Sequence, residues 1–146
     1  MHAVVRLYYL SRWFYQKNIP FIPNILHKLI RIVFACDVKY TADIGKNVGF
    51  FHNGLGVVIH SKAKIGDGSL LYQNVTIGGN GKSEEDNGVP TIGKNVFIGA
   101  GAVILGPVTI GDNARIGANS VVLNDVKANT TVVGSPAREV ITTNER

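Results

Sequence analysis

The sequence of 146 residues has little of several features that would otherwise define its class. It contains one cysteine, Cys36, which excludes an internal disulfide and is typical of a reducing compartment. Charges interrupt its apolar stretches too often for a membrane-spanning helix, which needs about 20 apolar residues. The start of the chain also lacks the apolar core and small-residue cleavage site of a secretory signal peptide. The length predicts a single domain, and these absences predict that it is cytoplasmic.

Acidic side chains are missing from the first 36 residues, a segment that we call the leader. The leader holds five basic residues, whereas residues 37–146 hold ten bases and ten acids, so the net charge of +5 comes from the leader alone. Seven aromatic residues also lie in it. Two helices are predicted there, at about 2–17 and about 24–35, divided by Pro20 and Pro23.

Beyond the leader, the sequence repeats every six residues. An aliphatic side chain returns at this spacing, and the clearest series consists of Ile92, Ile98, Ile104, Ile110, Ile116 and Val122. The period is neither the 2 of a strand nor the 3.6 of a helix. It predicts a solenoid, in which three short strands and three tight turns make a coil of about 18 residues, with Gly or Asn in the left-handed turn positions.

The repeat has two breaks. Nine residues, not six, separate Phe50 from Ile59, and the extra residues surround His52. Fifteen residues separate Ile77 from Ile92, and their polar, Gly-rich insert at 78–91 predicts a projecting loop. Breaks in a regular stack are often functional, so both are candidate parts of a site.

The second predicted helix of the leader has its own apolar side. Ile25, Leu29, Ile32 and Val33 recur there at helical spacing. We expect this side to cover the open end of the first coil, because a terminal repeat needs a cap. A basic, aromatic pair of helices is also suited to contact between copies of the chain or to the surface of an anionic membrane.

Three segments together resemble a known family: VTIGGNGKS from Val75, IGKNVFIGAGAVILGPVTIGDN from Ile92, and VVGSPARE from Val132. They are similar to left-handed β-helix acyltransferases with hexapeptide repeats, in particular to the serine acetyltransferase branch and its polysaccharide O-acetyltransferase relatives. The resemblance implies a mainly β fold, with a left-handed parallel β-helix over residues 37–140. The leader at 1–36 would precede it as a cap, and a tail at 141–146 would follow.

The resemblance also implies an enzyme and the place of its chemistry. In the family, a catalytic histidine has an aspartate fifteen residues before it, and these roles fall on His52 and Asp37. His52 would take the proton of a hydroxyl acceptor as it attacks the thioester of acetyl-CoA, and Asp37 would orient the imidazole. The family forms homotrimers with active sites between subunits, and no metal is expected.

For coenzyme A, the resemblance implies backbone contacts at Gly79, Ala100 and Ala118, where small residues let an extended pantetheine arm lie close. Arg115 and Arg138 are candidates for its phosphates. The candidates for contact with the acceptor are Phe51, Asn53, Tyr72 and Asn87.

Two positions depart from the serine acetyltransferase pattern. Those enzymes carry an acidic residue just before the catalytic histidine and an Arg-His pair in the long loop, whereas this chain has Phe51 and the loop sequence DNGVP at 86–90. Because an α-amino acid would find few charged partners there, we predict a saccharide acceptor, a small molecule or a lipid-linked sugar of capsule or exopolysaccharide synthesis. L-Serine, the acceptor of cysteine biosynthesis, is the alternative.

Two further classes stay open at this point. Zinc-dependent carbonic anhydrases also use this fold, but they need three histidine ligands, and the repeats offer only His52 and His60. A scaffold trimer would need neither a base nor acetyl-CoA. No nucleic-acid partner is expected, and His60 is assigned a structural or acceptor-binding role.

Overall fold

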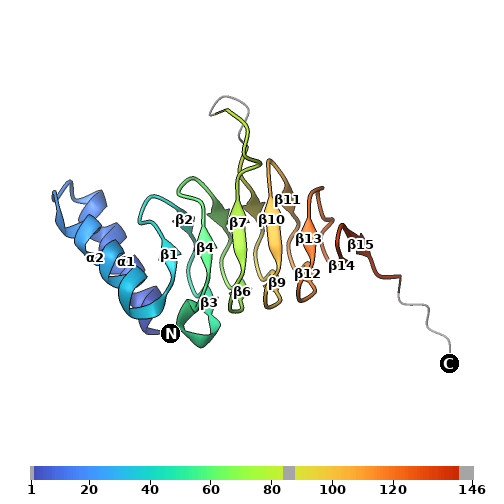
Figure 1. The fold of residues 1–146 in the computed structure, drawn as a ribbon, viewed down its shortest axis with the longest axis horizontal. Helices are drawn as coiled ribbons and strands as arrows, with labels where there is room; N and C mark the ends of the chain where they lie inside the picture. The colour runs from blue at the N-terminus through green and yellow to red at the C-terminus, as the bar shows by residue number, and fades with distance from the viewer. Residues whose placement is uncertain (1, 84–87, 142–146) are drawn as a thin grey trace.

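The computed structural model describes residues 2–83 and 88–141 as a helical end followed by a stack of short strands (Figure 1). The helical end consists of α1 (Ala3–Gln16) and α2 (Ile22–Phe34). A short 3-10 turn, η1 (Phe51–Gly54), lies between the third and fourth strands. The strands are β1 (Asp37–Val38), β2 (Asp43–Ile44), β3 (Gly49–Phe50), β4 (Val58–Ile59), β5 (Lys64–Ile65), β6 (Leu70–Leu71), β7 (Thr76–Gly78), β8 (Thr91–Ile92), β9 (Phe97–Ile98), β10 (Val103–Leu105), β11 (Thr109–Ile110), β12 (Arg115–Ile116), β13 (Val121–Val122), β14 (Thr131–Gly134) and β15 (Ala137–Glu139).

The strands form three sheets, because each third strand along the chain returns to the same side of the stack. Face A contains β1, β4, β7, β10 and β13; face B contains β2, β5, β8 and β11. Face C contains β3, β6, β9, β12 and β14, and β15 pairs antiparallel with β14 at its end. The edges of this three-sided β-helix are named below by the two faces that meet there.

The sixfold repeat places one aliphatic side chain of each strand inside the coil. On face A, Ile59 pairs with Ile77, Ile77 with Ile104, and Ile104 with Val122. Ile77 and Ile104 are completely buried, as are the equivalent isoleucines of faces B and C, Ile110 and Ile98. The prediction of a solenoid with an aliphatic interior is therefore confirmed.

The turns at the edges use the left-handed conformation, as predicted. Asn74, Asn95 and Asn119 have φ values of 60, 53 and 55°. Gly101 has φ +69°, and a Cβ atom there would lie 2.2 Å from Oδ1 of Asn119 in the next coil. Only glycine fits this position, because both the backbone conformation and the neighbouring coil exclude a side chain.

The boundary of α2 differs from the prediction, because Pro23 lies in its first turn and does not precede it. The first turn of a helix tolerates proline, since the missing N–H would have no partner within the helix anyway. Pro20 lies in the link between the two helices, where the sequence placed it.

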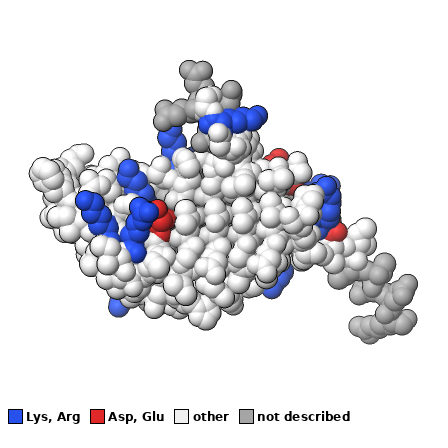
Figure 2. Space-filling view, viewed as in Figure 1, with Lys and Arg blue, Asp and Glu red and all other residues white. Residues whose placement is uncertain are grey.

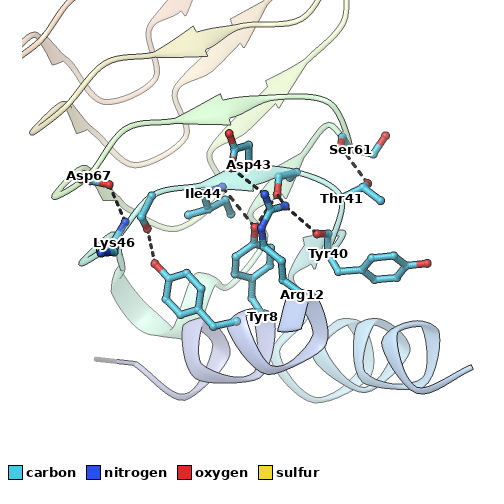
Figure 3. Close-up of polar contacts among 12 residues, drawn as sticks. Tyr8, Arg12, Tyr40, Thr41, Asp43, Ile44, Lys46, Ser61 and Asp67 are labelled. Carbon is cyan, nitrogen blue, oxygen red and sulfur yellow. Dashed lines mark hydrogen bonds and ion pairs between the residues drawn. The ribbon is translucent and has the colours of Figure 1, made fainter. Parts of the chain in front are cut away.

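Polar contacts join α1 to the first coil (Figure 3). The hydroxyl of Tyr8 donates to the carbonyl of Ala42 at 2.6 Å. Arg12 donates to the carbonyls of Tyr40 at 3.1 Å and Ala42 at 2.6 Å, and to the carboxylate of Asp43 at 2.9 Å. Burial raises the pKa of Tyr8 to about 12. Side chains of α1 therefore satisfy the backbone carbonyls of Tyr40 and Ala42 at the open end of the first coil.

The apolar side of α2 does not face the coil. Ile25, Leu29, Ile32 and Val33 are 61, 42, 83 and 59% exposed, while Ile30 on the opposite side of the helix is completely buried. The expectation that these four residues cover the first coil is wrong, because α1 provides the polar groups that the coil end needs. Within the described residues, neither helix has the length and hydropathy to cross a membrane.

Candidate active site

The first break in the repeat forms η1, at the C–A edge between β3 and β4. Its residues His52, Asn53 and Gly54 have successive φ values of 54, 53 and 71°. Gly54 has a left-handed backbone, and a Cβ atom there would lie 2.9 Å from Sγ of Cys36. Both the backbone conformation and this close approach favour glycine at position 54. Gly54 is buried, whereas His52 and Asn53 lie on the outside of the coil, where both are exposed.

Asp37, the predicted partner of His52, lies at the start of β1 with its carboxylate turned to α2. Nε2 of His27 is 2.9 Å from Oδ1 of Asp37, and Nη1 of Arg31 is 3.7 Å from Oδ2. Within the described residues, these two are the polar side chains that contact the carboxylate, and His52 is not among them. The pairing of Asp37 with His52 therefore stays a prediction.

Sequence reasoning assigned no chemistry to His27, although a signal was present. His27 and Arg31 are four residues apart in α2 and therefore share one side of the helix. The side chain of His27 is only 18% exposed, and that of Asp37 is 34% exposed. A helix that ends at Phe34 places this side next to Asp37, so the leader contributes to the surroundings of the predicted pair.

Aromatic rings line face C from the loop onward. The ring of Phe51 is stacked on Tyr72 with centroids 4.6 Å apart, and Tyr72 contacts Phe97 at 5.3 Å. The guanidinium of Arg115 lies over the ring of Phe97, 4.4 Å from its centroid. The imidazole of His52 is 6.5 Å from the ring of Tyr72. Phe51 and Tyr72 therefore form an apolar wall beside the histidine.

The structure brings four of the predicted site residues to the same edge. His52, Tyr72, Ala100 and Ala118 each follow a strand of face C and precede one of face A. The turns that carry Tyr72, Ala100 and Ala118 are stacked by backbone hydrogen bonds, from Gly101 to the carbonyl of Gln73 and from Asn119 to that of Ala100. Beyond Tyr72, the C–A edge therefore carries the small residues Ala100 and Ala118 in successive coils.

Other predicted residues lie at a different edge. Gly79 follows β7 at the A–B edge, at the base of the long loop, and His60 follows β4 at the same edge. Nδ1 of His60 accepts a hydrogen bond from the backbone N–H of Lys62 at 3.1 Å, so this histidine stabilises a turn. At about 3.3 Å per residue, face A separates the two edges by roughly 15 Å. Asn87 lies outside the described residues.

The two arginines proposed for phosphate contact are both exposed. Arg115 is on β12, where it covers Phe97, and Arg138 is on β15, where it donates to the carbonyl of Ala137 at 3.0 Å. Their strands, β12 and β15, flank β14 at the end of face C that is far from the leader. Neither arginine is held in an ion pair within the described residues.

Cys36 is completely buried. Burial raises the pKa of its thiol to about 12, and the neighbouring carboxylate of Asp37 adds to the effect. A thiol in this environment is not ionised at neutral pH and is therefore a poor nucleophile.

Comparisons with known proteins identify a family and several relatives. Residues 90–124 match the family "Bacterial transferase hexapeptide (six repeats)". The chain is 49% identical to a serine acetyltransferase of Synechocystis over 93% of its own length and 54% of that protein's. It is 38% identical to a serine acetyltransferase of Helicobacter pylori over 96% of its own length and 80% of that protein's. The chain spans about half the length of the first of these relatives.

Solved structures show the same likeness. The apoenzyme of soybean serine acetyltransferase superimposes with a TM-score of 0.87 at 42% identity, over 94% of this chain and 56% of that one. A serine acetyltransferase in complex with CoA superimposes with a TM-score of 0.84 at 34% identity, over 94% of this chain and 55% of that one. The predicted fold class, a left-handed parallel β-helix with a helical segment before it, is confirmed.

Proposed function

The chain belongs to the serine acetyltransferase branch of the hexapeptide-repeat acyltransferases, and from this premise we propose that it transfers the acetyl group of acetyl-CoA to the hydroxyl of L-serine. The products are O-acetyl-L-serine and free CoA. The observation that carries the proposal is the similarity to proteins named serine acetyltransferase over 93 and 96% of this chain, at 49 and 38% identity.

The prediction of a saccharide acceptor is wrong. It depended on Phe51 and on the loop at 86–90, where two charged features of serine acetyltransferases are missing. The relatives found by comparison are serine acetyltransferases, at 38–49% identity, and they favour serine. The missing charges at Phe51 and in the loop do not exclude serine as the acceptor. Backbone N–H and C=O groups can also bind a carboxylate or an ammonium group. The predictions of a role in capsule synthesis and of a lipid-linked sugar acceptor depended on the saccharide and are therefore wrong as well.

The base of the reaction is His52. Neutral imidazole takes the proton of the serine hydroxyl while that oxygen attacks the thioester carbon. A carbon–oxygen bond forms, the carbon–sulfur bond breaks, and the departing thiolate receives the proton from the imidazolium. Asp37 orients the imidazole, and the buried thiol of Cys36 supports direct transfer without an acetylated enzyme.

The active site lies between copies in a homotrimer. Two edges carry the residues assigned to one site: the C–A edge has His52 and Ala100, and the A–B edge has Gly79. A single small substrate cannot bridge roughly 15 Å of face A, whereas the C–A edge of one copy can meet the A–B edge of the next. His52 is also exposed on the isolated chain, which leaves one wall of the site to a partner.

Acetyl-CoA lies along the C–A edge. Its pantetheine arm passes the small residues Ala100 and Ala118, where no long side chain blocks the backbone. Its phosphates approach Arg115 and Arg138 near the far end of face C. Phe51 and Tyr72 form the apolar side of the acceptor pocket, with Asn53 as its polar neighbour.

The experiment measures CoA release with L-serine and with a panel of sugars and nucleotide sugars. We expect release with serine, and a loss of about 10²–10⁴-fold in turnover for His52→Ala without loss of the trimer. Lys17→Ala, an exposed change at the end of α1, serves as the control. Full activity of His52→Ala would overturn the base, and CoA release with a sugar but not with serine would overturn the acceptor.

A further inference from the structure

The outer side of α2 is an apolar surface with nothing packed on it in the single chain. Ile25, Leu29 and Ile32 lie along one side of the helix, and Phe21 directly precedes its first residue. The exposed fractions of Phe21, Ile25, Leu29 and Ile32 are 77, 61, 42 and 83%. We call these four residues the outer face. An exposed apolar row of this length is unusual on a protein without a binding partner for it. Figure 1 shows the helices at one end of the stack, so the row does not compete with the coil for contacts.

One basic side chain, Lys28, lies on the same side of α2 as the outer face, and the leader contains no acidic residue. Lys28 is four residues before Ile32 and three after Ile25, so it lies on the same side of α2. Arg12 and Arg31 are paired with Asp43 and Asp37, whereas no ion pair in the described part of the chain involves Lys28. Figure 2 shows basic side chains gathered over this end of the molecule, with only a small acidic patch beside them.

Two occupants can cover such a face, and its charge distinguishes them. A second copy would bring Lys28 and its neighbours against the same cations, without an acidic residue of the leader to compensate. An anionic lipid surface offers both apolar depth for the side chains and phosphate for the lysine. The helices of 14 and 13 residues are too short to span a bilayer, so α2 would lie flat in the headgroup region.

We propose that the outer face of α2 docks this protein on an anionic lipid bilayer. The four apolar side chains enter the boundary between headgroups and acyl chains, and Lys28 stays at the level of the phosphates. The proposal is independent of the acetyl acceptor, because the outer face and His52 lie on different elements.

The test is sedimentation of the full chain with vesicles. We expect binding to vesicles of phosphatidylcholine with about one-third phosphatidylglycerol, weaker binding to phosphatidylcholine alone, and release at high salt. Ile32→Asp should lower the bound fraction about tenfold. Ile141→Asp is the matched control, because Ile141 is 82% exposed and Ile32 is 83% exposed. Ile25→Asp, near the start of the helix, repeats the test at a position where an acid does not oppose the helix dipole.

Three results would overturn the proposal: no binding to anionic vesicles, equal losses for Ile32→Asp and Ile141→Asp, or a particle of twice the expected mass that Ile32→Asp dissociates. The last result would assign the face to a second copy. Serine acetylation is measured without vesicles on the same proteins. A loss of vesicle binding with unchanged acetylation concerns the outer face alone, whereas a lack of acetylation concerns the proposed function.

Discussion

The coil and the second helix of the leader both carry aliphatic residues at regular spacing. Those of the coil point into the protein, whereas those of the helix point into solvent. Ile98 in β9 is completely buried, whereas Ile32 in α2 is 83% exposed. In the coil, three parallel faces enclose one interior, so an inward side chain has a single place to go. A helix has no inside of its own, and its apolar side can face either the protein or another partner. Periodicity therefore shows which residues share a side but does not show what covers that side.

The largest expected effect comes from replacing one buried isoleucine of the coil and one exposed isoleucine of α2 and comparing their stabilities. Ile98→Ala should lower the free energy of unfolding by about 2–5 kcal/mol, because it leaves a cavity between stacked coils. Ile32→Ala should change it by less than about 0.5 kcal/mol, since the side chain is already in solvent. Urea unfolding of both variants measures the difference. Equal losses would show that the outer face is buried in the protein in solution.

The junction of leader and coil should respond to alkaline pH through Tyr8. Its pKa is raised from 10.0 to about 12 by burial, so the folded state holds the phenol proton more tightly than the unfolded state does. The stabilisation from this proton is complete below pH 10 and is lost as the pH rises towards 12. We expect a loss on the order of 2 kcal/mol over this range.

Tyr8→Phe tests this directly. The variant is expected to lack this part of the pH dependence, while Tyr15→Phe, at a tyrosine that is 48% exposed, should keep it. Cys36 titrates in all three proteins and cancels from the comparison. Unfolding measured from pH 8 to 11.5 distinguishes them, and identical slopes would contradict a buried phenol at the junction.

The sequence alone predicted the coil better than the site. The run from Ile92 to Val122 specified which residues face inward, because each repeat contacts only its neighbours. The break at His52 also marked the loop with its three left-handed residues. The spacing of His27 and Arg31 shows that they share one side of α2, but their contact with Asp37 depends on how α2 docks on the first coil. For the same reason, the sequence did not show which side of α2 faces solvent.

That contact gives the last and smallest prediction, in which the leader affects the chemistry of the coil. Nε2 of His27 lies 2.9 Å from Oδ1 of Asp37, and a partly buried hydrogen bond of this kind contributes about 1 kcal/mol. If Asp37 orients His52, then His27→Ala should lower kcat roughly fivefold and leave the KM for acetyl-CoA nearly unchanged, because only the carboxylate loses its support. His27→Gln keeps a donor and should restore most of the turnover, whereas Lys28→Ala, next to it on the exposed side of α2, should have no effect without vesicles. Equal losses of kcat in His27→Ala and His27→Gln, with a lower melting temperature, would show that His27 has only a structural role. A higher kcat for His27→Ala would mean that His27 and His52 compete for the carboxylate of Asp37.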